Sequence, residues 1–359
     1  MAKGRARVNG VPVVIGVPSY NHAGDVREAI ESILAQSYRN LGVVVVDDCS
    51  DDGTFEELEA YARRDSRLQC IRNERRVGMI ENWRRAFFEA TRRFPDAKFF
   101  AWGSDHDVWH PHWLKRLLEA LEANDDVVLA YPLSTKILVD GLVARKPWRF
   151  DTYGDERPFR RLRRASWDMS AGNMVYGLFR VDAMKTAGVF RRILVPDRML
   201  LAELCLQGQF QQVQEVLWFR RWYGRIFSLG RQRRSFFPDG RPAYAYVPWW
   251  ISHGVALGWN IGVRGVARPV VSRPAGVAIG VWYLLFAGAL HVVQQIRALR
   301  LWLLGWVPTL RGTRRRTING IWRFAKRIRK VYRVARRDGA IATRRAVTTA
   351  RRAVRVIRP

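Results

Sequence analysis

The sequence predicts an α/β fold built on a mainly parallel β-sheet flanked by helices, and three observations support this prediction. Short apolar runs rich in β-branched residues alternate along the chain with segments of helical period. The run LGVVVV at 41–46 is apolar throughout, as is typical of a strand buried on both faces of a parallel sheet. Acidic clusters at 47–52 and 105–107 directly follow predicted strands. Sites of α/β proteins lie at such carboxyl ends.

The individual elements follow from apolar spacing and turn residues. Strands are expected at 11–17, 41–46, 68–72, 127–131, 172–181 and 213–221. Helices are expected at 25–36, 55–64, 78–92, 111–123 and 199–207. The pattern weakens between 134 and 164, where the polar segment WRFDTYGDERPFRRLRR is expected to form a mobile loop over the site.

The stretch FFAWGSDHDVWHPHWL at 99–114 is the strongest candidate site. In an extended segment, residues i and i+2 point to the same side, so Asp105 and Asp107 are expected to converge while His106 points away. Two carboxylates at the end of a buried strand repel each other unless a cation lies between them. Such hard oxygen ligands suit Mg²⁺ or Mn²⁺. The alternative is a polar turn in which Asp107 caps the following helix.

Composition sets limits on the class of protein. The chain has 359 residues, 48% of them hydrophobic, and 15 Trp, which suffices for one large or two ordinary domains. Its three cysteines, Cys49, Cys70 and Cys205, lack the spacing of a metal site. Their small number argues against a disulfide framework and suits a reducing compartment. The basic N-terminus leads into an apolar run too short for a secretory signal.

The charge of the chain is extreme and uneven. The formal net charge is +30, and residues 311–359 carry 16 Arg and 2 Lys against a single acid, Asp338. Apolar residues recur at helical spacing between these bases and include Trp322, which predicts a basic amphipathic helix. Such a tail is expected to bind a polyanion, either an anionic membrane surface or a nucleic acid.

The region before this tail is apolar. Residues 247–266 are Trp-rich, and the 19 residues from 275 to 293 contain His291 as their only ionisable group. One complete span would place the Arg-rich tail and a cytosolic domain on opposite sides, against the preference of basic residues for the cytosolic side. We therefore expect a hairpin or in-plane insertion over 247–266 and 275–307. Burial in a homo-oligomer, or a buried core pair of helices with a solvated tail, are the alternatives.

Four motifs together resemble family 2 glycosyltransferases. They are VVIGVPSYNHAGDVREAIESILAQSY, VVVVDDCSDDGT, FFAWGSDHDVWHPHWL and PDRMLLAELCLQGQF, and they occur in this order between about 10 and 230. The resemblance implies the GT-A fold, a mixed but mainly parallel Rossmann-like sheet. It also implies a nucleotide-sugar donor, a divalent cation (Mn²⁺ or Mg²⁺) and an inverting reaction.

The resemblance assigns the donor side of the site to the first half of the sheet. Pro18, Tyr20 and Asn21 would line the pocket of the base and ribose, and Asp48 would face the edge of the base. The alternative for Asp48 is a turn-capping role. Asn82 and Arg72 lie where relatives add nucleotide contacts.

The resemblance also assigns the reacting end. Asp107 matches the metal-binding position, whereas Asp105 is the second metal ligand by geometry alone, and His106 interrupts the usual acid pair. Asp197 matches the catalytic base, with helix capping and Glu203 as alternatives. In WFRRWYG, Arg220 and Arg221 match the segment that reaches the diphosphate, but Tyr223 replaces a frequent His.

The sequence thus predicts an inverting, metal-dependent glycosyltransferase on the cytosolic face of a bacterial plasma membrane, peripheral or monotopic. It would transfer a sugar to a hydroxyl of a lipid-linked or cell-envelope glycan. The predicted parts are a catalytic domain at 1–235, an apolar membrane-associating helical region at 236–310 and an Arg-rich tail at 311–359. A nucleotidyltransferase on a similar sheet and a nucleic-acid-binding protein are the alternatives. The second would leave the acids at the strand ends unexplained.

Overall fold

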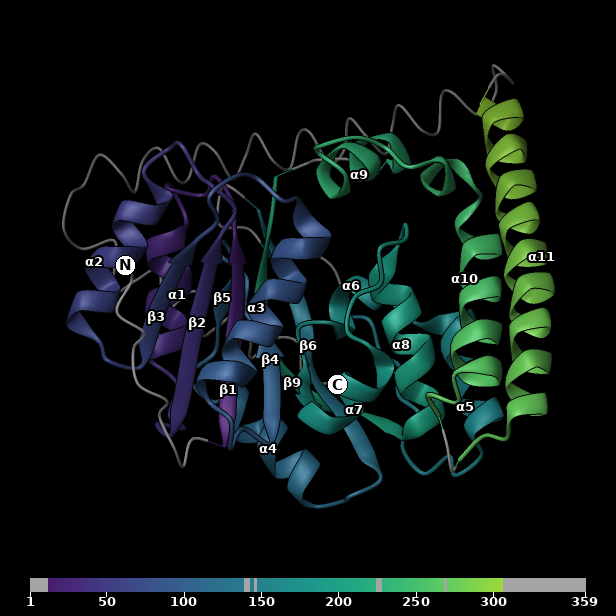
Figure 1. Ribbon diagram of the computed structural model, residues 1–359, viewed down its shortest axis with the longest axis horizontal. Helices are drawn as coiled ribbons and strands as arrows, with labels where there is room; N and C mark the ends of the chain where they lie inside the picture. The colour runs from purple at the N-terminus through teal and green to yellow at the C-terminus, as the bar shows by residue number, and fades with distance from the viewer. Residues whose placement is uncertain (1–11, 139–142, 145–146, 224–227, 268–269, 306–359) are drawn as a thin grey trace. The chain divides into compact units, whose positions relative to one another are not determined.

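The computed structural model describes residues 12–138, 143–144, 147–223, 228–267 and 270–305 (Figure 1). The chain divides into two compact units, Met1–Gly288 and Ala289–Pro359. The fold below belongs to the first unit. The predicted amphipathic tail at 311–359 lies outside the described residues.

Nine described strands form one mixed sheet in the order β3-β2-β1-β4-β8-β6-β9-β5, with β7 beside β6. The pairs β1–β2, β2–β3, β1–β4 and β6–β9 are parallel, whereas β8 runs antiparallel between β4 and β6. The mainly parallel mixed sheet is therefore confirmed. The strands are β1 Val13–Ser19, β2 Leu41–Asp47, β3 Leu68–Arg72, β4 Phe99–Trp102, β5 Val108–Trp109, β6 Val127–Leu138, β7 Val143–Ala144, β8 Leu178–Arg180 and β9 Gln209–Trp222.

Helices pack on both faces of this sheet, because alternate side chains of a strand point to opposite faces. Val14 and Val44 join the core beneath α3 and α5 to α8, whereas Val13 and Val43 join the core beneath α1 and α4. The described helices are α1 Val26–Leu34, α2 Thr54–Arg64, α3 Met79–Arg93, α4 Trp113–Glu122, α5 Pro158–Asp168, α6 Ala171–Met174, α7 Val181–Ala187, α8 Pro196–Gln207, α9 Leu229–Phe236, the 3₁₀ turn η1 Ala243–Tyr246, α10 Trp249–Leu257, the π-helical η2 Gly258–Val263 and α11 Arg273–Gly305.

The loop expected within 134–164 is only partly correct, because residues 147–157 form no helix or strand but regular elements lie on either side. β6 continues to Leu138, and α5 begins at Pro158. The guanidinium of the buried Arg161 in α5 donates to the carbonyl oxygens of Cys205 (2.7 Å) and Leu206 (3.2 Å) near the end of α8. One Arg of the basic run thus satisfies C-terminal carbonyls that the helix leaves unpaired. Arg161 therefore attaches α5 to the end of α8.

The expected strand at 172–181 is also only partly correct. Residues Ala171–Met174 form the short helix α6, and the strand β8 contains only Leu178–Arg180. Gly177 lies between them, and a Cβ there would approach the carbonyl oxygen of Ala130 to 2.5 Å. The close approach of β6 thus requires a glycine at this point.

The apolar region after 236 contains two helical segments of the first unit that pack together. They are α10 continued by η2, and the part of α11 up to Gly288, and we call them the helical pair. A Cβ on Gly280 of α11 would lie 2.5 Å from Cα of Gly258, and one on Gly276 would lie 2.6 Å from the backbone N of Gly262. Small residues every four positions on both helices permit this backbone contact, which is the packing mode of membrane helices. Ile261 and Tyr283 of the pair belong to the same core as α8.

One segment of the described residues, Arg273–Val293 of α11, is long and apolar enough to cross a membrane, with a mean hydropathy of 1.9. The segment meets only two criteria, length and apolar composition. Core helices of water-soluble proteins meet the same two criteria. The segment satisfies the minimum length for a span and does not by itself establish one.

Candidate functional site

Polar residues gather at the carboxyl edge of β1, β2 and β4. Ser19 at the end of β1 pairs with Asp47 at the end of β2, and Gly16 pairs with Trp102 at the end of β4. The segments that follow these strands therefore leave the sheet at one edge, as expected for a parallel α/β sheet. They contain the sequence motifs predicted to bind donor and metal.

Asp48 braces the turn that precedes α3. Its buried carboxylate accepts hydrogen bonds from Nδ2 of Asn73 (2.8 Å) and from the backbone N–H groups of Val77 (2.7 Å) and Gly78 (2.9 Å). Asn82 of α3 is also buried, and its Nδ2 donates to the carbonyl of Val46 over 2.9 Å. Both residues fix the wall of the expected base pocket. Their contact with a nucleotide stays a prediction.

Tyr20 and Asn21 follow β1 at the same edge. The guanidinium of Arg76 lies 4.3 Å from the centre of the Tyr20 ring, a cation–π contact. Nδ2 of Asn21 donates to Asp51 over 2.8 Å, and its backbone adopts a left-handed φ of 53°. Pro18 is buried within β1. The Tyr20 ring is thus the aromatic surface available at this end of the site.

The acidic motif differs from its expected geometry. The chain bends at Asp105 and His106, so the prediction that His106 points away is wrong. Nδ1 of His106 lies 2.6 Å from Oδ1 of Asp105, and its Nε2 lies 3.9 Å from Oδ1 of Asp107. The His106 ring also stacks on His22 at a centroid distance of 4.4 Å. The imidazole therefore lies between the two carboxylates.

The electrostatics of this group follow from burial and mutual contact. Burial acts to raise the pKa of Asp105, but the hydrogen bond and charge of His106 outweigh it and lower that pKa. Burial acts to lower the pKa of His106, but Asp105 and Asp107 outweigh it and raise that pKa. The pKa of Asp107 is raised, mainly by burial. The imidazole of His106 thus occupies the position between the carboxylates where the sequence predicted a cation.

The same group offers ligands for a metal ion. One ligand atom each from His22, Asp105 and His106 lies within 4.8 Å of the others. Imidazole nitrogen and carboxylate oxygen together suit Mn²⁺ and similar divalent ions. Sequence reasoning missed His22. Its position directly after Asn21, at the same sheet edge as the DxD motif, was the available signal.

Asp107 is held by the last strand. Its Oδ2 accepts from Nε1 of Trp218 (3.0 Å), and its Oδ1 accepts from the backbone N–H of Arg221 (2.8 Å). The guanidinium of Arg221 pairs with Asp25 (3.3 Å) and Glu28 of α1. Arg221 therefore fastens β9 to the acidic motif and to α1. A contact of its side chain with the diphosphate stays a prediction.

Asp197 is the second residue of α8, whose N-cap is Val195, so the alternative that Asp197 caps this helix is wrong. Burial raises the pKa of Asp197. The positive charge of Arg220 acts to lower the pKa of both Asp197 and Asp107, so its guanidinium lies within electrostatic range of both.

Glu203, the alternative base, lies further along α8. Its carboxylate is buried and accepts from Nε of Arg191 (2.9 Å) and Nδ2 of Asn260 (3.1 Å). Burial raises its pKa to about 7. These contacts join α8 to η2 of the helical pair, and they favour a structural role for Glu203.

Comparison with known proteins shows what part of the chain is similar to a known family. Residues 14–185 match the family model of glycosyl transferase family 2. An uncharacterized glycosyltransferase of Haemophilus influenzae is 32% identical over 115 residues, which are 32% of this chain and 34% of that protein. The putative teichuronic acid biosynthesis glycosyltransferase TuaG of Bacillus subtilis is 30% identical over 112 residues, 31% of this chain and 42% of that protein. The chain thus spans well under half the length of these relatives.

A solved structure confirms the fold. TarS 1–349 from S. aureus, in complex with UDP-GlcNAc, superposes with a TM-score of 0.50 and 15% sequence identity. The match covers 68% of this chain and 66% of that chain. This chain therefore has the GT-A type of fold, and its residues 14–185 are similar to glycosyl transferase family 2.

Proposed function

We propose that the protein is an inverting glycosyltransferase that moves a sugar from a nucleotide diphosphate to a hydroxyl acceptor. The observation that carries this proposal is the cluster of His22, Asp105, His106 and Asp107 at the carboxyl edge of the parallel strands. A donor diphosphate would lie beside this acidic motif, and an acceptor hydroxyl would lie beside Asp197. The family 2 match over residues 14–185 supports the same reaction class.

The donor would bind along the edge from Asp48 to Asp107. The Tyr20 ring, backed by Arg76, offers an aromatic face for the base, and the turn held by Asp48 closes the pocket. A uridine nucleotide-sugar is the first donor to test, because TarS is described in complex with UDP-GlcNAc. Arg220 would neutralise charge on the departing diphosphate.

A divalent cation fits the residues that surround the acidic motif. His22, Asp105 and His106 would hold it, with Asp107 facing the same space. Bound there, the ion would neutralise charge on the diphosphate leaving group. A ligating imidazole must be neutral, so His106 would bind the ion in its unprotonated form.

Asp197 would act as general base. An acceptor hydroxyl must lose its proton as its oxygen attacks the anomeric carbon on the face opposite the leaving diphosphate. Attack from that face inverts the anomeric configuration. A carboxylate whose pKa is raised by burial is a better proton acceptor than an ordinary one, and general bases contribute on the order of 10²–10⁴-fold.

The helical pair supports attachment to a membrane surface. It exposes large apolar side chains at helical spacing, and the neighbouring α5 adds Trp167, which is 62% exposed and lies near Phe286. Exposed Arg157, Arg160 and Arg163 on or next to α5 suit anionic headgroups. The exposed apolar side chains are Val255, Trp259, Val263, Val277, Val281 and Leu285.

A surface of this kind favours a peripheral or monotopic enzyme on the cytosolic face, where nucleotide-sugars are found. The acceptor would then be a lipid-linked or cell-envelope glycan.

Product analysis tests the proposed reaction. Purified protein with Mn²⁺, a panel of nucleotide-sugars and bacterial membranes as acceptor should release the nucleoside diphosphate. Release of pyrophosphate would instead indicate a nucleotidyltransferase. The anomeric configuration of the transferred sugar, measured by NMR coupling constants, should be opposite to that in the donor.

A further inference from the structure

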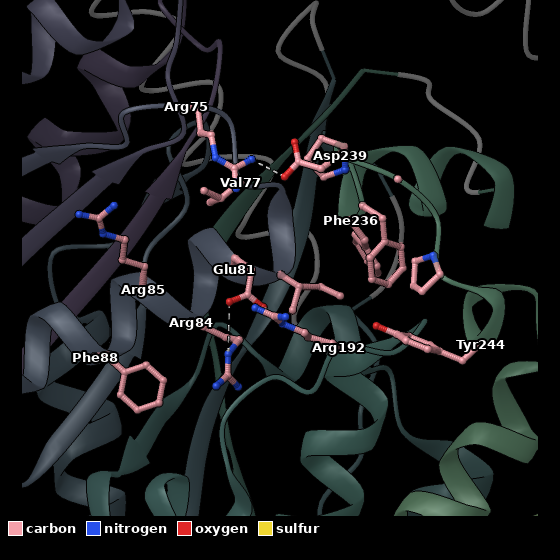
Figure 2. Close-up of a pocket in the computed structure, with 15 residues that line it drawn as sticks. Arg75, Val77, Glu81, Arg84, Arg85, Phe88, Arg192, Phe236, Asp239 and Tyr244 are labelled. Atoms are coloured by element: carbon pink, nitrogen blue, oxygen red, sulfur yellow. Dashed lines mark hydrogen bonds and ion pairs between the residues drawn. The ribbon is translucent and has the colours of Figure 1, made fainter.

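A cavity of about 680 Å³ lies beside the donor edge, on the outer face of α3 (Figure 2). One wall is the turn and helix from Arg75 to Phe88, and the opposite wall is the segment from Phe236 to Tyr244. Arg192, from the loop before α8, completes it. None of the assigned donor, metal or base residues lines this cavity, so it is a separate feature of the first unit.

Four arginines line this cavity against two acids. Arg75 pairs with Asp239 across it, and Glu81 is shared by Arg192 (2.6 Å) and Arg84 (3.8 Å). Nearly 70% of the side chains of Arg75 and Arg192 is exposed to solvent, so both heads can exchange a protein carboxylate for a ligand anion. Guanidinium groups bind planar carboxylates and phosphates through paired, charge-assisted hydrogen bonds.

The fourth arginine has a neutral partner. Nη1 of Arg85 donates to Oδ1 of Asn73 over 2.5 Å. The lining thus holds a positive charge that its own acids do not balance. A ligand carrying negative charge is the complement of this lining.

Aromatic rings stand next to these charges. Phe88 and Tyr244 are 46% and 44% exposed, and both line the cavity with Phe236 and Phe237 (Figure 2). Arg84 lies 5.4 Å from the centre of the Phe88 ring. Flat apolar rings beside hydrogen-bonding groups are suited to the C–H faces and hydroxyls of sugars. Rings and guanidinium groups together match a glycan that carries acidic groups.

Two sets of contacts connect the cavity lining to segments of the proposed site. Val77 in its lining donates its backbone N–H to Asp48, and Arg84 donates to the carbonyl oxygens of Gly188 (3.2 Å) and Phe190 (2.5 Å). The loop that contains these carbonyls leads to Asp197. One wall of the cavity is therefore fixed to the loop that precedes Asp197 in the sequence.

We propose that this cavity binds an acidic segment of the glycan acceptor, held by Arg75 and Arg192 and stacked on the exposed rings. The acidic groups are phosphates or carboxylates on the sugars. The proposal rests on the proposed glycosyltransferase function, because that function supplies the acceptor.

Calorimetric titration of the full chain tests this site. The probes are one maltooligosaccharide in phosphorylated, carboxylated and neutral forms, with UDP and Mn²⁺ at saturation to fill the donor site. Arg75→Gln/Arg192→Gln should weaken binding of an acidic form on the order of tenfold, because two charge-assisted contacts are lost. The acidic form that binds more tightly identifies the charged group.

The matched control is Arg27→Gln/Arg63→Gln. These arginines are 66% and 67% exposed and pair with glutamates of α2, far from the cavity lining. The control should bind the acidic form as the wild type does. Three results would overturn the proposal. The two double variants could weaken binding equally, the wild type could bind the neutral form as tightly as the acidic form, or it could bind a single-stranded oligonucleotide and none of the saccharides. Donor hydrolysis should be unchanged in the cavity variant, and its absence from the wild type would point instead to failure of the proposed function.

Discussion

The backbone N–H of Arg221 donates to Oδ1 of Asp107 over 2.8 Å, although 114 positions separate the two residues in sequence. The contact arises because β5, directly after the acidic motif, pairs antiparallel with β9. The position of the metal-motif carboxylate therefore depends on the last strand of the sheet. Removing a β9 donor should disturb the metal site without changing any of its ligands.

Trp218→Phe tests this dependence. The change removes the Nε1–H that donates to Oδ2 of Asp107, so a buried carboxylate oxygen loses its partner. We expect Mn²⁺ affinity to fall about 10–100-fold, as is typical when a group that orients a ligand is lost. Isothermal titration with Mn²⁺ measures it.

Trp109→Phe is the control for that variant. Trp109 stacks on Trp218 at a centroid distance of 5.6 Å, and its Nε1 has no hydrogen-bond partner within the described residues. Its loss should leave Mn²⁺ affinity within about twofold. Equal effects of the two changes would mean that packing, not the bond to Asp107, governs the site.

Asp197→Asn should spare donor binding and stop transfer. The amide keeps the shape of the side chain but cannot accept the acceptor's proton, so kcat should fall about 10²–10⁴-fold while the Kd for the nucleotide-sugar stays constant. Initial rates and donor titrations measure the two quantities. If Glu203→Gln abolished transfer and Asp197→Asn did not, the base would be Glu203.

Glu203 should make stability depend on pH. Its pKa is raised to about 7 in the folded protein, above its ordinary value of 4.5, mainly because of burial. The folded state thus holds the proton more tightly than the unfolded state. The resulting stability is fully present below about pH 4.5 and is lost as pH rises through about 7.

Urea unfolding between pH 4.5 and 8 should show a decline in the free energy of unfolding, and Glu203→Gln should flatten this decline. An unchanged slope in Glu203→Gln would contradict this account.

Trp259→Ser should weaken membrane binding. Trp259 is 58% exposed on the helical pair, and burying an aromatic side chain of this size in a bilayer stabilises by on the order of 2 kcal/mol. Co-sedimentation with anionic vesicles at high salt, which screens the basic tail, should show a decrease of more than tenfold. Tyr153→Ser is the control, because Tyr153 is 49% exposed on the loop before α5. If Trp259→Ser bound the vesicles as well as Tyr153→Ser, the helical pair would be a core element only.

The sequence could predict elements whose cause is local. Apolar period and turn residues located β1 to β3 and the first four helices within a few residues, and the acids after β2 and β4 indicated the edge of the candidate site. The bend at His106 was not predictable from the i, i+2 rule. That rule assumes an extended chain, whereas the contact of His106 with Asp105 and its stacking on His22 fold the turn back.

Features that depend on distant contacts could not be predicted. Arg161 looked like part of a polar loop because its partners, the end carbonyls of α8, lie more than 40 positions away. The ion pairs of Arg221 could not be predicted for the same reason, since their partners, Asp25 and Glu28, lie almost 200 positions earlier in the sequence. The arginine-lined cavity requires the segment from 236 to 244, whose residues carry no motif of their own.

The thermal shift caused by nucleotide-sugars, with and without Mn²⁺, tests the central claim most directly. A ligand that binds only the folded state stabilises it by RT ln(1 + [L]/Kd). We predict that at least one nucleotide-sugar raises Tm in the presence of Mn²⁺, and that Asp107→Asn loses the Mn²⁺-dependent part of the rise. If no nucleotide-sugar changed Tm with any divalent ion, the assignment of this sheet edge as a donor site would be contradicted.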